Sequence, residues 1–282
     1  MTLYVPKKPQ FNFTYTNANA AVVAGYGTSI TPGASNTFGS YTEVISDTNV
    51  TLDCYGIHIC LSNASVSAQA KDLLVTIGID TAGGTSYVDF ISNLIASCAS
   101  SALVSNGGHN YYFPVKIPAG TAIAAKASVN NATAGTIRCA IWLFGAPQST
   151  EGLVYGTGVE TIGAVTATSA GTAVTPGTSG EGSWTSLGTT TKPCFAWQYG
   201  MGVNDGTMAA LSYGVDLSYG NGTNQITIDS DKRYISATTE SLASELGLPM
   251  GCNVPVGGAL YGRISCSGTP DSNVSMAAYG VY

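Results

Sequence analysis

Hydrophobic and polar residues alternate along short stretches of the chain. Two such stretches are YGIHICLS (55–62) and YYFPVKIP (111–118). The residues that fall on one side of an extended backbone are Ile57, Ile59 and Leu61 in the first stretch, and Tyr111, Phe113, Val115 and Ile117 in the second. A period of two is typical of half-buried β-strands. A third stretch, TIRCAIWLFG (136–145), is mostly apolar and predicts a strand buried on both sides.

Turn-forming sequences separate these stretches, among them TPGASN, SNAS, TAGG, NGGHN, IPAG and VNNATAG. Seven or eight short strands in roughly 110 residues predict a β-sandwich or jelly roll. Only two stretches, 93–103 and 238–248, have a pattern compatible with a helix, and Ser241 to Leu246 is the better candidate. The fold class is therefore predicted to be all-β.

The chain also contains an internal repeat. GTSITPGASNTFGSYT (27–42) matches GTAVTPGTSGEGSWT (171–185), which aligns Pro32 with Pro176 and Tyr41 with Trp184. Further matches follow in the same order: DCYGIHIC (53–60) with PCFAWQYG (193–200), TIGID (76–80) with SYGVD (212–216), GGTSYV (83–88) with NGTNQI (221–226), and residues 120–145 with 257–280. Such a repeat is far longer than a solenoid period, so we expect each copy to be a domain with its own core.

The repeat divides the chain into four parts. Residues 1–26 form a predicted N-terminal arm, 27–150 a first β-sandwich, 151–170 a linker rich in Thr, Ala and Gly, and 171–282 a second β-sandwich. The expected architecture is two tandem jelly-roll-like domains related by duplication, preceded by an extended arm.

Composition narrows the classes of function. Only 9% of the residues are charged, 35 are glycine, and the net charge is −6. Low charge argues against disorder and against helical bundles. The absence of a Lys/Arg cluster argues against nucleic acid as a partner, and no apolar run has the length of a membrane span. The first ten residues show no secretory signal pattern.

Charge is distributed unevenly between the two halves. The first 150 residues carry six basic and six acidic residues, and the remainder carry four basic and ten acidic ones. One interpretation is chance drift of surface residues. The other is that the neutral half packs against other subunits while the acidic half faces solvent, because interface cores are poor in charge.

The sequence contains no recognisable catalytic, cofactor-binding or metal-ligating motif, and we expect no enzyme and no cofactor. The two histidines are His58 and His109, and His109 lies in a predicted loop. Asp229 and Asp231 lie in DSDKR, whose spacing lacks the Gly and distal Glu of a calcium loop, so a solvated turn is the favoured interpretation.

The seven cysteines form no CxxC pair. Cys54, His58 and Cys60 would share one face of a regular strand, but Cys54 and Cys60 would lie about 20 Å apart, too far to bind one ion. Most of the cysteines are expected to be small buried hydrophobes. Because the number of cysteines is odd, at least one thiol has no disulfide partner within the chain. That thiol could form an intersubunit disulfide in oxidising surroundings.

Aromatic residues are candidates for either core or ligand contacts. Trp142, Trp184 and Trp197 fall on predicted strands and are expected in the core. The Tyr-rich stretches GHNYY (108–112) and DLSYGNG (216–222) are predicted loops that could make lectin-like contacts with a glycan.

Several stretches together resemble a family of tailed-bacteriophage virion structural proteins with duplicated β-sandwich domains. In the first copy these are GTSITPG, GSYTEV, CYGIHIC, LVTIGIDTAGGTSYVDFI and the stretch from YYFPVKIPAG to IWLFG; in the second they are SWTSLG, MAALSYGVDLSYGNGTN and YGRISCSGTPDSNVSMAAYGV. The resemblance runs from about residue 25 to the end of the chain. It implies a structural component of a phage particle, without distinguishing head, neck or tail.

Two functions follow as hypotheses. The leading one is a virion structural protein, either a capsid decoration or a head–tail, collar or fibre component. Its partners would be other capsid, collar or tail subunits and further copies of itself in a homo-oligomer. The alternative is a glycan-binding adhesin that recognises the host surface. A polysaccharide depolymerase is disfavoured because catalytic machinery is missing from the sequence. The aromatic-rich arm is expected to dock as an extended strand on a neighbouring subunit or on the capsid.

Overall fold

The computed structural model is built almost entirely from β-strands. The residues that it describes are 14–16, 27–63, 73–96, 109–129, 137–145, 154–163, 171–178, 180–203, 211–237, 240–244, 248–269 and 274–282. Within these ranges the helical content is limited to one 3₁₀ turn, η1 (Asp47–Asn49). No helix among them is long and apolar enough to cross a membrane.

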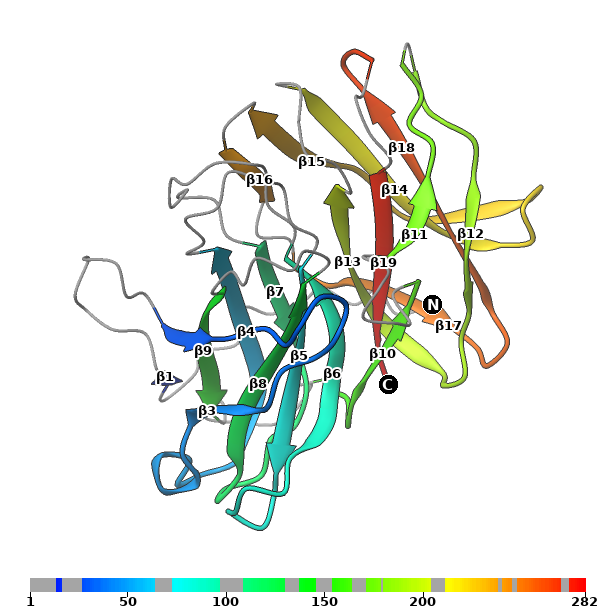
Figure 1. Cartoon of the computed structure of the whole chain (residues 1–282). Helices are drawn as coiled ribbons and strands as arrows, with labels where there is room; N and C mark the ends of the chain where they lie inside the picture. Colours follow the sequence, from blue (N-terminus) through cyan, green and yellow to red (C-terminus); the bar gives the residue numbers. More distant parts are fainter. Residues whose placement is uncertain are drawn as a thin grey trace.

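The first sandwich consists of two antiparallel sheets (Figure 1). Its strands are β1 (Thr14–Thr16), β2 (Thr28–Ile30), β3 (Thr42–Ile45), β4 (Cys54–Asn63), β5 (Leu73–Asp80), β6 (Val88–Ile95), β7 (His109–Phe113), β8 (Ala122–Val129) and β9 (Ile137–Gly145). One sheet has the order β1-β9-β4-β7, with β2 also paired to β9, and the other has the order β3-β8-β5-β6.

The second sandwich repeats this arrangement. Its strands are β10 (Val159–Ile162), β11 (Thr172–Val174), β12 (Thr185–Thr189), β13 (Cys194–Val203), β14 (Ser212–Gly220), β15 (Gln225–Ala237), β16 (Glu240–Ser244), β17 (Met250–Val254), β18 (Ala259–Cys266) and β19 (Val274–Val281). One sheet has the order β10-β19-β13-β17, with β11 also paired to β19, and the other has the order β12-β18-β14-β15-β16.

Both sandwiches have jelly-roll topology. Numbered along the chain, the eight strands β2 to β9 form sheets of order 1-8-3-6 and 2-7-4-5, and β11 to β15 with β17 to β19 give the same two orders. This is the arrangement produced by two Greek keys in a double sheet. The prediction of an all-β fold of two tandem, duplicated jelly-roll-like sandwiches is therefore confirmed.

The repeat extends to one strand on the amino-terminal side of each jelly roll. β1, from the segment predicted as an arm, pairs with Trp142–Phe144 at one end of β9. β10, from the segment predicted as a linker, pairs with Ala278–Val281 at the corresponding end of β19. The described part of the arm thus forms its strand within the same chain, and the rest of the arm lies outside the described residues.

The conserved turn of the two repeats has the same hydrogen bonds in both sandwiches. The backbone N–H groups of Gly33 and Gly39 both donate to the carbonyl oxygen of Ala127 on β8, at 3.4 and 2.9 Å. Gly177 and Gly182 donate to Ile264, the corresponding residue of β18, at 2.9 and 3.1 Å. A Cβ atom at Gly39 would lie 2.5 Å from a backbone oxygen, so the close approach requires glycine. The TPG motif of each repeat therefore forms a turn that is hydrogen-bonded to a neighbouring strand.

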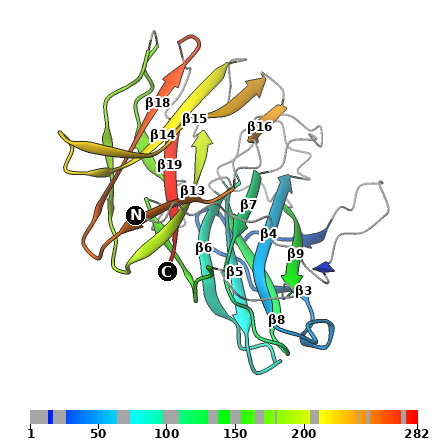
Figure 2. The same cartoon turned by 180° about the vertical axis from the view of Figure 1, so that it is seen from behind.

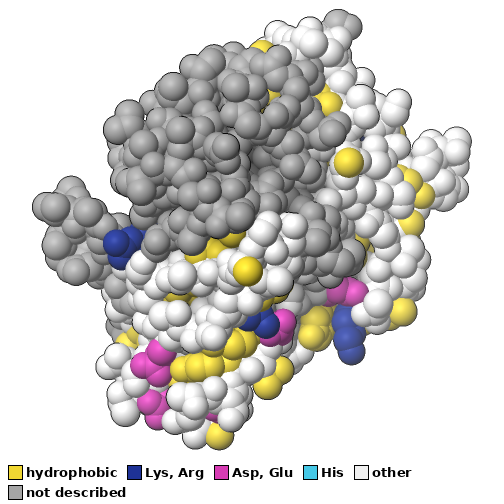
Figure 3. Space-filling model, viewed as in Figure 1, with side chains coloured by type: hydrophobic (Ala, Val, Ile, Leu, Met, Phe, Trp, Pro, Cys, Tyr) yellow, Lys and Arg dark blue, Asp and Glu magenta, His cyan; other side chains and the backbone are white. Residues whose placement is uncertain are grey.

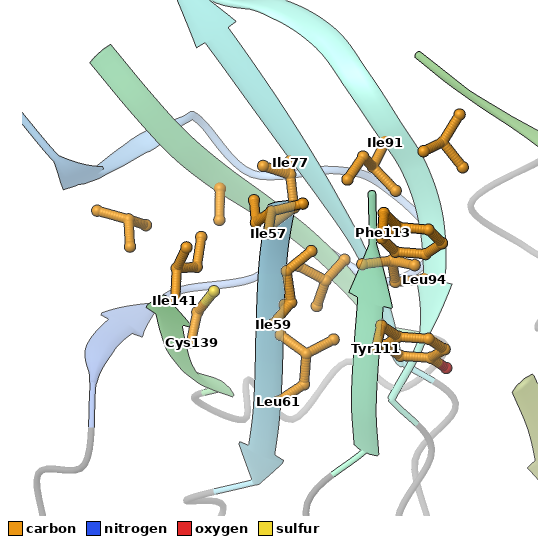
Figure 4. Packing of buried hydrophobic residues seen from close by; sticks show 14 of the residues in the cluster. Ile57, Ile59, Leu61, Ile77, Ile91, Leu94, Tyr111, Phe113, Cys139 and Ile141 are labelled. Atoms are coloured by element: carbon orange, nitrogen blue, oxygen red, sulfur yellow. The ribbon is translucent and has the colours of Figure 1, made fainter. Parts of the chain in front are cut away.

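The predicted alternation positions the core of the first sandwich (Figure 4). The inward residues of β4, β7 and β9 meet Ile77 of β5 and Ile91 and Leu94 of β6 in one buried cluster. On the outer side of β9, Ala140 is buried but Arg138, Trp142 and Phe144 are half-buried. This strand is therefore less covered on its outer side than its apolar sequence predicts.

The two sandwiches pack tightly against each other (Figures 1 and 2). β19 is buried along its whole length, because its two faces serve two cores. Val274, Met276 and Ala278 belong to the core of the second sandwich, whereas Ala277, Tyr279 and Val281 belong to the cluster of the first.

Hydrogen bonds hold this interface at the edge strands β6 and β7. The Tyr279 hydroxyl accepts from the backbone N–H of Ile95 at 2.9 Å and donates to the carbonyl of Asn93 at 3.1 Å. The Tyr279 ring meets the Tyr111 ring edge-on, with centroids 5.3 Å apart. The Tyr112 N–H donates to the side chain of Gln198 on β13 at 3.2 Å. The contacts orient the sandwiches relative to each other.

Both helix predictions are wrong within the described residues. Residues 93–95 belong to β6, and Glu240–Ser244 form β16. In β6 the cause is tertiary: β6 has one extra residue opposite Val75–Ile77 of β5, which shifts the register, and Asn93 adopts a positive φ of 57°. The spacing of apolar residues along β6 therefore departs from the two-residue period of a regular strand, although this segment is not a helix.

Candidate functional site

The outer face of the β3-β8-β5-β6 sheet carries an open, shallow cleft of about 680 Å³. We call it the tyrosine cleft; it is lined by Ser40, Tyr41, Glu43, Thr85, Ser86 and Tyr87. A second depression of about 260 Å³ adjoins it at Ser86 and reaches Asp89 and Phe90. Figure 3 shows this face of the first sandwich, where hydrophobic side chains form a patch bordered by acidic ones.

Tyr41 forms one wall of the cleft and is held in position from several sides. A Cβ atom at Gly78 of β5 would lie 2.5 Å from the Tyr41 ring, so the absence of a side chain there makes room for the ring. The Lys126 ammonium lies 4.6 Å from the ring centroid, a cation–π distance. The Tyr41 hydroxyl donates to Asp89, which also binds Lys126 Nζ at 2.7 Å.

Tyr87 lies against Tyr41, with its ring centroid 5.4 Å from that of Tyr41 and the two planes tilted by 46°. Its hydroxyl donates to Glu43 Oε2 at 3.2 Å. The β5–β6 turn before Tyr87 is organised by the buried Asp80, which accepts hydrogen bonds from the N–H groups of Ala82 and Ser86, both at 2.9 Å. Tyr87 is therefore presented by an ordered turn.

Carboxylates dominate the electrostatics of the cleft. Burial, followed by the negative charges of Glu43, Asp80 and Asp47, raises the pKa of Tyr87. Burial and the hydrogen bond to Asp89 raise the pKa of Tyr41 well above its ordinary value. Both hydroxyls thus remain protonated donors at neutral pH.

Asp89 remains ionised. Burial acts to raise its pKa, but hydrogen bonds from Lys126 and Tyr41 outweigh that effect, and the net pKa is lowered. Lys126 is the one basic side chain of the described residues bound in this group, so the rim is negative overall.

The second sandwich contains a counterpart of the Tyr41–Lys126 pair. The Arg263 guanidinium lies 4.3 Å from the Trp184 ring centroid. Arg263 occupies the position of Lys126, since it is the fifth residue of β18 as Lys126 is of β8. Arg263 binds the carboxylates of Asp216, at 2.7 Å, and Glu181. A cation held between an aromatic ring and a carboxylate is thus common to both copies.

The Tyr87–Glu43 pair is particular to the first sandwich. From the strand pairing, Tyr87 in the first sandwich corresponds to Gln225 in the second, the residue before the Ile226 that pairs with Tyr219. Glu43 corresponds to Ser186 in the same way. Gln225 instead accepts a hydrogen bond from Ser218 at 2.9 Å. The duplication therefore distinguishes a cation–aromatic clamp that both copies have from the Tyr87–Glu43 pair, which the first copy has and the second replaces with Gln225 and Ser186.

The residues singled out in the sequence lie elsewhere and do not converge. His109 begins strand β7 rather than lying in a loop, and it is 3% exposed. His58 is half-buried on the outer face of β4, where its ring stacks on Trp142 at 4.9 Å and Nε2 lies 3.2 Å from Asn110 Oδ1. Among the described residues, no group of three His, Cys, Asp or Glu side chains could hold a metal ion.

Asp229 and Asp231 lie inside strand β15 rather than in a turn. Register shifts interrupt its pairing with β14 at this point, and Asp231 has a φ of 57°. Asp229 accepts a hydrogen bond from the Tyr199 hydroxyl at 3.0 Å, and the Asp231 N–H donates to Asp216 at 2.7 Å. The expectation of a turn is wrong because a β-bulge accommodates the polar run within the strand, whereas Ser230, Asp231 and Arg233 are exposed to solvent as expected.

The described cysteines are free thiols, four of them buried and two half-buried: Cys54, Cys139, Cys194 and Cys266 in the first group, Cys60 and Cys252 in the second. The prediction that most are buried hydrophobes agrees with this. Cys54 and Cys60 do not share a face, because a bulge between Cys54 and Gly56 turns Cys54 into the core. Cys98 lies outside the described residues.

The aromatic predictions have mixed outcomes. Trp197 is in the core, as expected, but Trp142 and Trp184 are only half-buried on outer faces. The stretch GHNYY is not a loop: its last four residues belong to β7, and Tyr111 is buried at the interface between the sandwiches. The sequence motifs do not mark Tyr41 and Tyr87 as a site. The repeat does align Tyr41 with Trp184, and it aligns Tyr87 with Gln225; this difference at the second position is the signal for Tyr87 in the sequence.

No model of a known protein family matches the chain, and no curated protein matches it. Three solved structures show distant similarity. PNGF-II is 12% identical, with a TM-score of 0.33; the match covers 90% of this chain and 65% of PNGF-II, just under two thirds of its length.

The tandem CBM22-1–CBM22-2 domain of Paenibacillus barcinonensis Xyn10C is 10% identical, with a TM-score of 0.28, over 97% of this chain and 99% of its own. A putative secreted protein from Eubacterium rectale is 9% identical, with a TM-score of 0.16, over 88% and 70%. At these TM-scores the similarities carry no argument about function.

Proposed function

We propose that the chain is a non-enzymatic structural component of a bacteriophage particle that works through contacts with other virion proteins and with further copies of itself. The observation that carries the proposal is the shared strand β19, whose two faces complete two cores. The two jelly rolls share a buried interface and present sheet faces at their surface. Such an arrangement is suited to repeated protein–protein contacts. The family resemblance of the sequence supports the same role.

Composition supports assembly contacts as well. The described surface holds few charges, and several large apolar side chains are exposed, including Val88 at 69%, Ile226 at 60% and Val256 at 61%. Charge-poor surfaces are typical of protein interfaces. We expect the isolated chain to form a symmetric homo-oligomer.

The test is the composition of purified particles. Quantitative mass spectrometry is expected to find the chain in them: hundreds of copies would make it a capsid decoration, and a few to a few dozen would make it a collar, tail or fibre protein. Its absence from intact particles would contradict the proposal. Light scattering of the isolated chain measures the oligomer independently.

A glycan-binding adhesin is the second candidate, and the tyrosine cleft is the observation that favours it. Two tyrosine rings and the Glu43 carboxylate line an open surface depression, and the Asp89 carboxylate lines the depression beside it. Aromatic faces and fixed hydrogen-bonding groups are the elements of a site that orients a small polar ligand. Saccharide binding by the isolated chain tests this candidate without reference to the particle.

A further inference from the structure

The cleft has features that the shared structural clamp does not require. Lys126, Tyr41 and Asp89 have a working counterpart in Arg263, Trp184 and Asp216, so a cation clamped on a ring suffices to hold this part of the sheet. The counterpart exists without a second ring, because Gln225 stands where Tyr87 does. The second sandwich therefore forms the same fold without a pair equivalent to Tyr87 and Glu43, so the fold does not require this pair.

The added pair faces open space. Glu43 is exposed and Tyr87 is half-exposed, and both line the depression of about 680 Å³. The Tyr41 ring is already flanked by Gly78 and Lys126. Tyr87 is therefore the ring available for stacking, and Tyr41 acts as the fixed wall beside it.

The polar groups are suited to hydroxyl donors. Glu43 and Asp89 each accept a hydrogen bond from a tyrosine hydroxyl, yet an ionised carboxylate has about four acceptor sites. Their remaining sites can accept from ligand hydroxyl groups. Ser40, Thr85 and Ser86 are exposed at the rim and can both donate and accept.

Charge selects among ligands with hydroxyl groups. The negative charges of Glu43, Asp80 and Asp47 act on Tyr87, and Asp89 binds the hydroxyl of the neighbouring Tyr41, while Lys126 neutralises one of these charges. An acidic sugar would meet net repulsion of like charges. An uncharged pyranose offers an apolar C–H face for the ring and hydroxyl groups for the carboxylates.

We propose that the tyrosine cleft binds an uncharged saccharide, with a sugar ring stacked on Tyr87 and its hydroxyl groups hydrogen-bonded to Glu43 and Asp89. This inference rests on the second candidate function and names its site and its class of ligand. The adjoining depression at Ser86 gives room for a further sugar unit, so an oligosaccharide is bound more tightly than a monosaccharide.

The full chain is titrated with cello-, malto-, xylo- and chitotetraose as neutral probes and with tetragalacturonic acid as an acidic probe. NMR or calorimetry measures the binding of each probe. The wild type is expected to bind at least one neutral probe and to bind the acidic probe at least tenfold more weakly. Tyr87→Ala is expected to weaken binding at least tenfold. Glu43→Gln, which removes a charge, is expected to narrow the difference between neutral and acidic probes.

The matched control is Tyr155→Ala, since Tyr155 is a 38% exposed tyrosine whose ring packs on Tyr55 outside the cleft. It is expected to bind as the wild type does, and thermal unfolding of each variant reports whether it is folded. Neutral binding that survives Tyr87→Ala, or a preference for the acidic probe, would overturn the site while leaving glycan binding in place. No binding to any probe would overturn both, and the structural role would still be decided by particle composition.

Discussion

Individual residues show how the two copies have diverged around a common backbone. His58 and Gln198 occupy corresponding positions, the fifth residue of β4 and of β13. Gln198 is buried against the first sandwich and accepts a hydrogen bond from Tyr112, whereas His58 stacks on Trp142 on an outer face. The same strand position thus serves an interface in one copy and an aromatic stack in the other.

This difference predicts a pH effect. Burial lowers the pKa of His58, and the hydrogen bond with Asn110 offsets only part of that shift. The unfolded chain therefore takes up a proton at a higher pH than the folded chain does. Stability is complete above the unfolded pKa of about 6.5 and declines as the pH falls from there through the folded pKa.

Urea unfolding at pH 7.5 and pH 5.0 measures the effect. The wild type is expected to lose more stability between these two values than His58→Gln, which carries the residue of the other copy and does not titrate. Equal pH dependence of the two proteins would contradict the assignment of a neutral, half-buried His58.

Single strands carry the contacts that join the two sandwiches. β19 alternates between the two cores residue by residue, and its Tyr279 lies where Trp142 lies on β9. Its hydroxyl is wholly buried and bonds two backbone groups of β6. Because a strand directs alternate side chains to opposite faces, one element can serve both sandwiches.

Tyr279→Phe is expected to reduce the free energy of unfolding by about 1–3 kcal/mol, because it leaves the buried N–H of Ile95 without its acceptor. Tyr219→Phe is the control, since the Tyr219 hydroxyl has no hydrogen bond among the described residues and the ring is only half-buried. Chemical denaturation of both variants provides the comparison; a loss of similar size in both would show that the Tyr279 hydroxyl is not special.

At the scale of the whole molecule, the relative placement of the sandwiches depends on close packing. A Cβ atom at Gly200 of β13 would lie 2.5 Å from the Tyr111 hydroxyl. The segment between the sandwiches adds backbone ties, since Gly156 exchanges hydrogen bonds with the Pro114–Lys116 stretch and Gly158 bonds Tyr282. The chain is therefore expected to unfold as one unit.

Gly200→Leu is expected to force the interface open while leaving each core intact. Two unfolding transitions should replace one in calorimetry, and the radius of gyration from small-angle scattering should rise. Gly180→Leu is the matched control, because Gly180 is exposed and a Cβ atom there would meet nothing within 4 Å. A single unchanged transition in Gly200→Leu would show that the interface does not couple the sandwiches.

Much of the fold could be predicted from local pattern. The inward residues of β4 and β7 and the duplicated TPG turn all follow from spacing along the chain. The errors arise where pairing overrides pattern: the bulge at Cys54, the irregular β6, and the bulge around Asp231. A bulge depends on the partner strand, so the sequence of one strand does not reveal it.

The sequence by itself determined that the protein is all-β, that it consists of two related jelly rolls, and which residues of its regular strands face inward, because strand period and turn chemistry are local properties. Only the tertiary structure decided that β19 serves two cores, that Tyr111 is an interface residue rather than a loop residue, and that Tyr41 and Tyr87 lie side by side in one cleft. Those outcomes depend on which strands become neighbours and on which sheet face is left uncovered, and the two cleft tyrosines, 46 residues apart, meet only through that pairing.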